Sequence, residues 1–325
     1  MKLSCMRILV LVVCLPLVVE SLVIPGHSLI RRRSCDRREQ FIQKKVEAAA
    51  VAYEDESLGP SVGPLSIKIG KKDVNLAGLF FGLSMTLWVI TLYPLVLACA
   101  LLSQIFDKKR RRAMDFIVSL WARFSMLTCG YRPKLIGVEN LPLLKEAVLY
   151  VPNHTSYLDI LTLSGFLKRP FKYISKIEIL RIPLIGWAMG FAGHVALKRT
   201  DRRSQLETFK AAVESLSNGN SIVAFPEGTR ALNGKLQKFK RGPFKMATAA
   251  NVDIIPIAIC DLHKWHPPSA LLPLARPSGV QIKVLPRIST KDNQDADDIL
   301  DQAFDAINAA LPAHQQHGDL RNSDL

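Results

Sequence analysis

The sequence lacks the cysteine pattern of a disulfide-stabilised or metal-binding protein. Its six cysteines are spread over 325 residues, and no two have the spacing C-x-x-C, which zinc sites and redox motifs commonly use. Histidines and carboxylates show no cluster with metal-ligand spacing either, so we expect no metal and no cofactor. These absences argue against a disulfide scaffold and favour a reducing compartment for the folded part of the chain.

Nucleic-acid-binding motifs are missing as well, although the chain is basic. Lysine and arginine number 43 against 28 acidic residues, a formal net charge of +15. Such a charge predicts an anionic partner: nucleic acid, an anionic lipid or a phosphorylated substrate. The sequence has no zinc-finger spacing and no aromatic RNA-binding signature. It also has no long basic helix outside the N-terminal targeting region. We therefore expect no nucleic-acid partner.

Charged residues are absent from residues 76–106. A run of this length can form a tilted transmembrane helix. Pro94 leaves open a bent helix or a hairpin of two shorter helices that enters one leaflet. Five consecutive cations at residues 108–112 follow the run directly, as positive flanks of membrane segments do. The sequence therefore predicts a membrane-embedded segment with membrane lipids as partners.

The N-terminal region resembles a targeting leader. Lys2 and Arg7 precede an apolar run at residues 8–19, which has the form of a signal peptide. A basic segment at residues 31–38 follows, as in proteins sent to a plastid through the secretory pathway; a signal anchor retained in the endoplasmic reticulum is the alternative. We expect a cleavable leader at residues 1–38, a linker at residues 39–75, and a plastid membrane as the location.

Beyond residue 107, apolar segments of strand length alternate with amphipathic helical ones. This alternation predicts an α/β domain over residues 107–311, with a mostly parallel central sheet flanked by helices. A disordered polar tail is expected at residues 312–325. The expected strands cover residues 147–151, 171–175, 194–197, 221–225, 254–259 and 280–285, and the expected helices cover residues 113–129, 204–218 and 295–311.

A histidine and an aspartate five residues apart follow the first of these strands. Residues at this spacing lie about 140° apart around a helix, so the two meet only if His154 lies in the loop and Asp159 in the first helical turn. Ser156 as N-cap would place Asp159 at the third helical position. The carboxylate would then orient the imidazole as a general base. The alternative is a helix-capping aspartate beside an ordinary loop histidine.

Two more polar segments follow strand ends: Phe225-Pro226-Glu227-Gly228-Thr229-Arg230, called here the FPEGTR loop, and the basic turn at residues 198–203. Carboxyl ends of strands in an open α/β sheet border one crevice, which these segments and His154 would share. Gly228 permits close backbone approach, and the guanidinium of Arg230 fits a phosphate. In the basic turn we favour Lys198 and Arg199 as phosphate contacts; a solvated basic loop is the alternative.

The order of these motifs resembles the glycerolipid acyltransferase family, and within it the 1-acyl-sn-glycerol-3-phosphate (lysophosphatidate) acyltransferases of plastid and bacterial type. The resemblance covers about residues 113–290. Asn153-His154-x4-Asp159 looks like the catalytic motif of that family, and the FPEGTR loop looks like its glycerophosphate-binding motif. Residues 239–244 are similar to its Phe-Lys-x-Gly segment, and Pro256 falls in its Pro-containing apolar motif. The chain departs from many relatives at Lys198, where they carry an acid.

The resemblance implies the glycerolipid acyltransferase fold and the transfer of an acyl group from acyl-CoA or acyl carrier protein to the sn-2 hydroxyl of lysophosphatidate. His154 would take the hydroxyl proton and Asp159 would orient the imidazole. Arg230, with Lys198 or Arg199, would hold the phosphate. Glu227 would position the loop or the glycerol, and Gly228 and Thr229 would complete the substrate site. The alternatives are another acceptor, such as glycerol 3-phosphate or another lysophospholipid, a lipid-binding membrane protein without activity, and a hydrolase that uses water.

Overall fold

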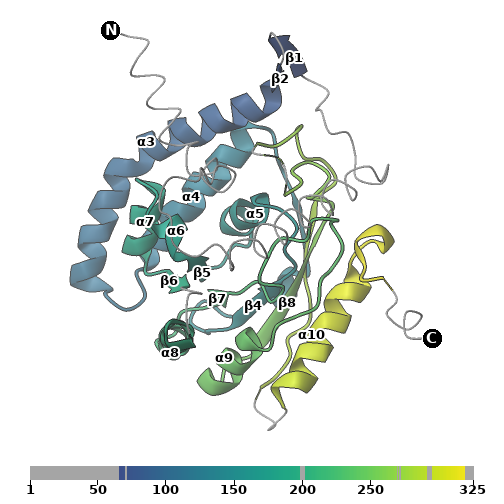
Figure 1. The fold of residues 1–325 in the computed structure, drawn as a ribbon. Helices are drawn as coiled ribbons and strands as arrows, with labels where there is room; N and C mark the ends of the chain where they lie inside the picture. The colour runs from purple at the N-terminus through teal and green to yellow at the C-terminus, as the bar shows by residue number, and fades with distance from the viewer. Residues whose placement is uncertain are drawn as a thin grey trace, which may run out of the picture.

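Figure 1 shows the computed structural model, which describes residues 66–69, 72–197, 202–268, 270, 272–290 and 295–318. The predicted leader at residues 1–38 and most of the predicted linker lie outside these described residues. In chain order the elements are β1 (Ser66–Ile69), β2 (Lys72–Asn75), α3 (Leu76–Phe106), α4 (Arg112–Thr128), β3 (Lys134–Ile136), η2 (Val138–Asn140), β4 (Leu149–Pro152), α5 (Leu158–Phe166), β5 (Lys172–Lys176), α6 (Ile177–Leu180), α7 (Ile185–Ala192), β6 (Val195–Leu197), α8 (Arg202–Ser217), β7 (Ile222–Val223), α9 (Gly242–Ala250), β8 (Ile254–Cys260), β9 (Gln281–Val284), α10 (Ala296–Ala310) and η3 (Ala313–Gln315).

The predicted mostly parallel sheet is confirmed. Seven described strands form one sheet in the order β3-β9-β8-β4-β7-β5-β6, and of these described neighbours only β8 and β9 run antiparallel. The predicted strands lie within one or two residues of their expected bounds, and residues 221–225 contribute the two-residue strand β7. The sequence pattern did not predict β3, because three residues are too few to show alternation.

Helices cover both faces of the sheet, and β4 is buried between them. Tyr150 on β4 packs in the apolar cluster that contains residues of α4 and α5. Its neighbours Leu149 and Val151 pack in the cluster formed with α8, α9 and α10. Successive side chains of a strand point to opposite faces, so a strand buried on both sides reads as the continuous apolar run seen in the sequence. The end of β4 is thereby held rigidly in the middle of the domain (Figure 1).

The helix α3 is continuous from Leu76 to Phe106, so the hairpin alternative for this segment is wrong. The side chain of Asn75 accepts a hydrogen bond from the N–H of Gly78 at its start. Pro94 has no N–H and therefore removes one hydrogen bond from the helix. The helix α4 packs alongside α3, and Phe81 and Met85 of α3 are buried in the apolar cluster between them. Among the described residues, α3 is the helix long and apolar enough to cross a membrane by length and composition.

The five cations after α3 divide into two groups. Lys108 and Lys109 are exposed. The three arginines instead donate hydrogen bonds to main-chain carbonyls of distant residues: Arg110 to Asn218, Arg111 to Gly190 and Phe191, and Arg112 to Leu144. The predicted positive flank therefore also ties the end of α3 to the α/β domain.

The helix predicted at residues 204–218 begins two residues earlier, because α8 starts at Arg202. Glu207 lies 3.4 Å from the guanidinium of Arg203 as an i,i+4 ion pair, and Leu206 is 53% exposed. The predicted linker is also partly ordered, since β1 and β2 pair as an antiparallel hairpin.

The predicted disordered tail is corrected where the structure describes it. Residues 313–315 form the short helix η3, and Gln315 is fully buried. Its main-chain carbonyl accepts from the N–H of Leu236 at 2.8 Å, and its side-chain Oε1 accepts from the N–H of Asp261 at 2.7 Å. The C-terminal segment thus fastens the loop that follows residue 230 to the end of β8.

The substitution Gln315→Ala should lower the free energy of unfolding by about 1–3 kcal/mol, because it leaves the N–H of Asp261 without its acceptor. Urea denaturation in detergent would measure the change. The matched control is Gln205→Ala on the exposed side of α8, which should leave the midpoint unchanged. Equal midpoints for the two variants would contradict the role assigned to Gln315.

Candidate active site

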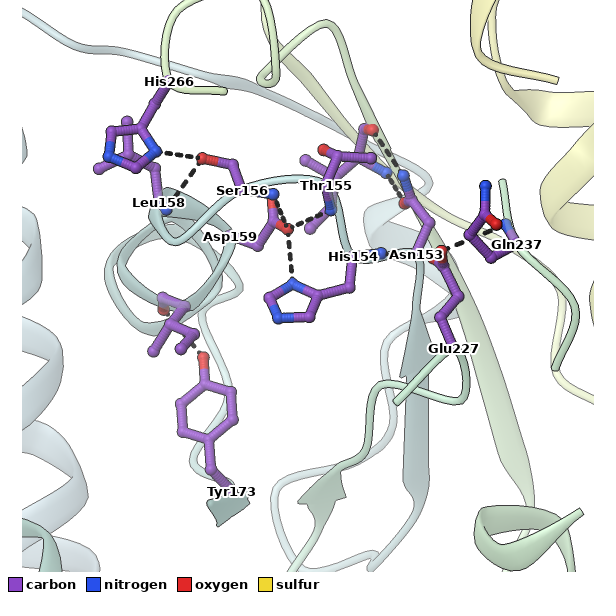
Figure 2. Close-up of polar contacts among 12 residues, drawn as sticks. Asn153, His154, Thr155, Ser156, Leu158, Asp159, Tyr173, Glu227, Gln237 and His266 are labelled. Atoms are coloured by element: carbon purple, nitrogen blue, oxygen red, sulfur yellow. Dashed lines mark hydrogen bonds and ion pairs between the residues drawn. The ribbon is translucent and has the colours of Figure 1, made fainter. Parts of the chain in front are cut away.

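His154 and Asp159 meet at the junction between β4 and α5, as the sequence predicts. Nδ1 of His154 lies 2.9 Å from Oδ2 of Asp159 (Figure 2). The carboxylate is fully buried, whereas 15% of the histidine side chain is exposed. Because a carboxylate only accepts hydrogen bonds, the neutral imidazole carries its proton on Nδ1 and leaves Nε2 as the proton acceptor. This is the arrangement of an oriented general base.

The same carboxylate oxygen also organises the turn that carries the histidine. Oδ2 of Asp159 accepts from the N–H groups of Thr155 and Ser156, each at 2.8 Å. The hydroxyl of Ser156 accepts from the N–H of Leu158 at 3.1 Å. The helix consequently begins at Leu158 with Tyr157 as N-cap, so the prediction of Ser156 as N-cap is wrong by one residue. The predicted placement, with the histidine in the loop and the aspartate in the first turn, is confirmed.

A second histidine, His266, supports this turn from the segment that follows β8. Its Nδ1 lies 3.1 Å from the Ser156 hydroxyl. Since that hydroxyl oxygen already accepts from Leu158, its own hydrogen is free to be donated to the imidazole. His266 is almost fully buried. Sequence reasoning missed it, because 110 residues separate the two partners.

The imidazole of His154 is stacked on the ring of Phe225, with 3.9 Å between the ring centroids and 24° between the planes. The strands β4 and β7 are neighbours, so residues that follow their carboxyl ends lie side by side. On its other side, Phe225 is parallel to the ring of Tyr173 at 6.5 Å. The Tyr173 hydroxyl donates to the carbonyl of Ile160 at 2.9 Å. An aromatic ring directly after a strand end was the sequence signal that could have pointed to this contact.

The FPEGTR loop is hydrogen-bonded to both main-chain groups of His154. The N–H of His154 donates to Oε1 of Glu227 at 2.6 Å (Figure 2). Its carbonyl accepts from the N–H of Ala231 at 2.8 Å. The loop and the histidine are therefore held as one unit. Arg230, partly buried, immediately precedes Ala231 and thus lies on this unit.

Of the two roles expected for Glu227, positioning of the loop is the one that its contacts support. Glu227 is 4% exposed, and its second oxygen accepts from the N–H of Gln237 at 3.2 Å. With both oxygens directed at main-chain donors, the side chain positions the loop. Burial raises the pKa of Glu227 to about 8, against the opposing effect of the two hydrogen bonds. At neutral pH the carboxyl group therefore carries less than a full negative charge beside a site expected to bind a phosphate.

The remaining predicted residues are placed as follows. Gly228 has a φ of +76°, a conformation that favours glycine. Thr229 is exposed on the same loop. Lys198 and Arg199 lie outside the described residues. Within the described part of the chain, no group of three or more histidine, cysteine or acidic side chains is arranged to hold a metal ion.

The fold and this site define a member of a known class of transferase domain. The family model described as Acyltransferase matches residues 132–260. This span contains the β4–α5 junction with His154 and Asp159, the FPEGTR loop and most of the central sheet.

Three relatives narrow the class. A 1-acyl-sn-glycerol-3-phosphate acyltransferase of Chlamydomonas reinhardtii is 37% identical over 270 residues, which cover 82% of this chain and 76% of that protein. A chloroplastic 1-acyl-sn-glycerol-3-phosphate acyltransferase of Arabidopsis thaliana is 41% identical over 204 residues, 61% of this chain and 55% of that one. The crystal structure of the 1-acyl-sn-glycerophosphate (LPA) acyltransferase PlsC from Thermotoga maritima has the same fold, with a TM-score of 0.62 at 22% identity, covering 72% of this chain and 93% of that chain. The chain belongs to the 1-acyl-sn-glycerol-3-phosphate acyltransferase family.

The substitution Asp159→Asn should lower kcat for acyl transfer by roughly 10⁴-fold, because an amide cannot stabilise the imidazolium or enforce the Nδ1–H tautomer. Steady-state assays with a labelled acyl donor would measure the loss, and thermal melting would check that the fold is retained. The matched control, Asp305→Asn on the exposed side of α10, should keep full activity. A kcat within tenfold of wild type would contradict the role of Asp159.

The substitution Phe225→Leu should lower kcat about tenfold while leaving both KM values within twofold. The stacked ring holds the imidazole plane and interacts favourably with its positive charge, an effect worth about 1 kcal/mol or more at a partly desolvated site. Phe225→Tyr retains the ring and should restore most of the rate. A leucine variant with wild-type kcat would show that the ring only fills space.

Proposed function

We propose that this chain is a membrane-bound acyltransferase that moves an acyl group from a thioester donor to the sn-2 hydroxyl of lysophosphatidate, giving phosphatidate. The observation that carries the proposal is the unit formed by His154, the buried carboxylate of Asp159 and the FPEGTR loop. It joins a base whose Nε2 makes no hydrogen bond with any described residue to the loop that carries Arg230. The choice of acceptor is supported by the algal and plant relatives, which are 1-acyl-sn-glycerol-3-phosphate acyltransferases.

The reaction needs one base and no covalent intermediate on the protein. Nε2 of His154 takes the proton of the sn-2 hydroxyl as that oxygen attacks the thioester carbonyl carbon. The carboxylate of Asp159 stabilises the imidazolium that forms. The carbon–sulfur bond then breaks, and the departing thiolate takes the proton from the imidazolium. The enzyme returns to its starting state with the same tautomer.

The phosphate of the acceptor would be held by Arg230, whose planar guanidinium can donate two parallel hydrogen bonds to it. Lys198 and Arg199, on the predicted basic turn, are proposed to assist. Gly228 and Thr229 belong to the same binding loop. Glu227 contributes by holding this loop against His154 rather than by touching the substrate.

Attachment to a membrane is supported by the surface of α3. Large apolar side chains along it are exposed, among them Leu101 at 66%, Ile105 at 65% and Phe106 at 81%. An apolar surface this extensive is costly in water and favourable in a bilayer. The acceptor is itself a lipid, so a domain fixed to the bilayer by α3 has its substrate at hand.

A plastid membrane is the proposed location, supported by the chloroplastic relatives and by the form of residues 1–38. In a plastid, acyl carrier protein is the proposed donor partner, with acyl-CoA as the alternative thioester. The net charge of +15 suits association with an acidic carrier.

The decisive experiment incubates the protein in detergent or vesicles with labelled acyl donor and one acceptor at a time. Lysophosphatidate should yield labelled phosphatidate, whereas glycerol 3-phosphate and lysophosphatidylcholine should yield little product. His154→Ala should reduce the product to background because the base is lost, while membrane association and the melting temperature persist. His314→Gln, a change at a partly exposed histidine of the C-terminal segment, should keep its activity.

Three other outcomes of this experiment would each reject one part of the proposed function. Release of free fatty acid with no acceptor product would favour a hydrolase. Product with another acceptor alone would replace lysophosphatidate. Full activity in His154→Ala would reject the base.

A further inference from the structure

Lys240 lies across the FPEGTR loop, although it is ten residues beyond the end of that loop. A β-carbon added to Gly228 would be 2.7 Å from Nζ of Lys240, 3.0 Å from its Cε and 3.2 Å from its Cδ. The main-chain N–H of Lys240 donates to the carbonyl of Pro226 at 2.9 Å. Both the backbone and the ammonium end of this residue therefore lie against the loop.

The contact places the lysine side chain directly over Gly228, whose φ of +76° is the reason that this position favours glycine. The contacting atoms are the flexible end of the lysine, so the ammonium group lies on the loop without being locked there.

The residues around Lys240 fix its position. The ring of the preceding Phe239 packs edge-on against Phe304 of α10, with 5.1 Å between the centroids. The following Arg241 is paired with Asp297, also on α10. The helix α9 begins at Gly242. In the Phe-Lys-x-Gly segment, the neighbours therefore anchor the chain to the domain while the lysine turns back to the loop.

The positive charge of Lys240 is not used within the described part of the chain. Its side chain makes no hydrogen bond and no ion pair with any described residue. Glu227, the carboxyl group of the loop, directs both oxygens to the main-chain donors of His154 and Gln237 instead. The lysine is exposed, so its ammonium group is open to a ligand on the loop.

We propose that Lys240 is a substrate-binding residue that supplies a further cation to the phosphate of the acceptor, in addition to Arg230 and the proposed Lys198 and Arg199. The inference deepens the proposed function and rests on it. A phosphomonoester carries a charge of about −1.5 to −2 at neutral pH, more than one guanidinium neutralises. Arg230 offers a planar fork and Lys240 a compact point charge. The ligand class is a phosphomonoester of a glycerolipid acceptor.

The test compares Lys240→Met with Lys235→Met and Lys238→Met, which remove one charge each from exposed lysines of the same segment. The methionine at 240 keeps the stem over Gly228 but removes the charge. It should raise KM for lysophosphatidate roughly 10- to 100-fold, the usual effect of losing a hydrogen bond to a charged group. The KM for the acyl donor and kcat should stay within twofold, and Lys240→Arg should restore acceptor binding. The two control variants should behave as wild type.

A second measurement separates charge from packing. Added salt should raise KM for lysophosphatidate more steeply in the wild type than in Lys240→Met, because one screened cation is missing from the variant. Lys240→Gln repeats both comparisons should the methionine variant fold poorly. Equal acceptor KM values in Lys240→Met and Lys238→Met would overturn the proposal and leave the proposed function intact.

Failure of the proposed function has a different signature, since it appears in the wild type. Wild-type protein that acylates another phosphomonoester, such as glycerol 3-phosphate, would overturn the proposed acceptor. Lys240→Met should then raise KM for that phosphomonoester, and an unchanged KM would overturn the role of Lys240. Wild-type protein that accepts only substrates without a phosphomonoester would overturn both proposals.

Discussion

One buried carboxylate oxygen holds the centre of this protein together. Oδ2 of Asp159 accepts hydrogen bonds from the imidazole of His154 and from the N–H groups of Thr155 and Ser156. A buried negative charge is costly unless donors surround it, and the turn after β4 supplies these donors. The same three contacts close the turn, start α5 and select the tautomer. The chemistry and the local fold are therefore products of a single interaction.

The parallel sheet turns that local arrangement into a site. Since β4 and β7 are parallel neighbours, their carboxyl ends bring the histidine turn and the FPEGTR loop to the same edge. Glu227 and Ala231 then bind the main chain of His154 from both sides, and Phe225 covers one face of its ring. The proposed base and the loop proposed to bind the phosphate are thus held at fixed separation. Such fixed placement is what an acyl transfer between two bound substrates requires.

Charge and apolar surface are distributed to suit a lipid that carries a phosphate. The exposed side of α3 is apolar over most of its length, while the three arginines after it are committed to main-chain carbonyls of the domain. These arginines therefore orient α3 relative to the catalytic edge of the sheet. Around the FPEGTR loop the acidic side chain is buried with a raised pKa, and the exposed charges are positive. The apolar surface of α3 suits the acyl chain of a lysophospholipid, and the positive surface around the FPEGTR loop suits its phosphate.

The sequence alone determined what depends on near neighbours. The strand pattern followed from apolar runs, and the meeting of His154 with Asp159 followed from a spacing of five residues at a strand–helix junction. Contacts between distant residues were decided only in the tertiary structure: the Phe225 stack, the carboxyl group of Glu227 on the N–H of His154, Lys240 over Gly228, and the burial of Gln315. These depend on which strands lie side by side and how far each loop reaches. A local pattern records the shape of a segment but not the neighbour it will meet, so these contacts could not be derived from it.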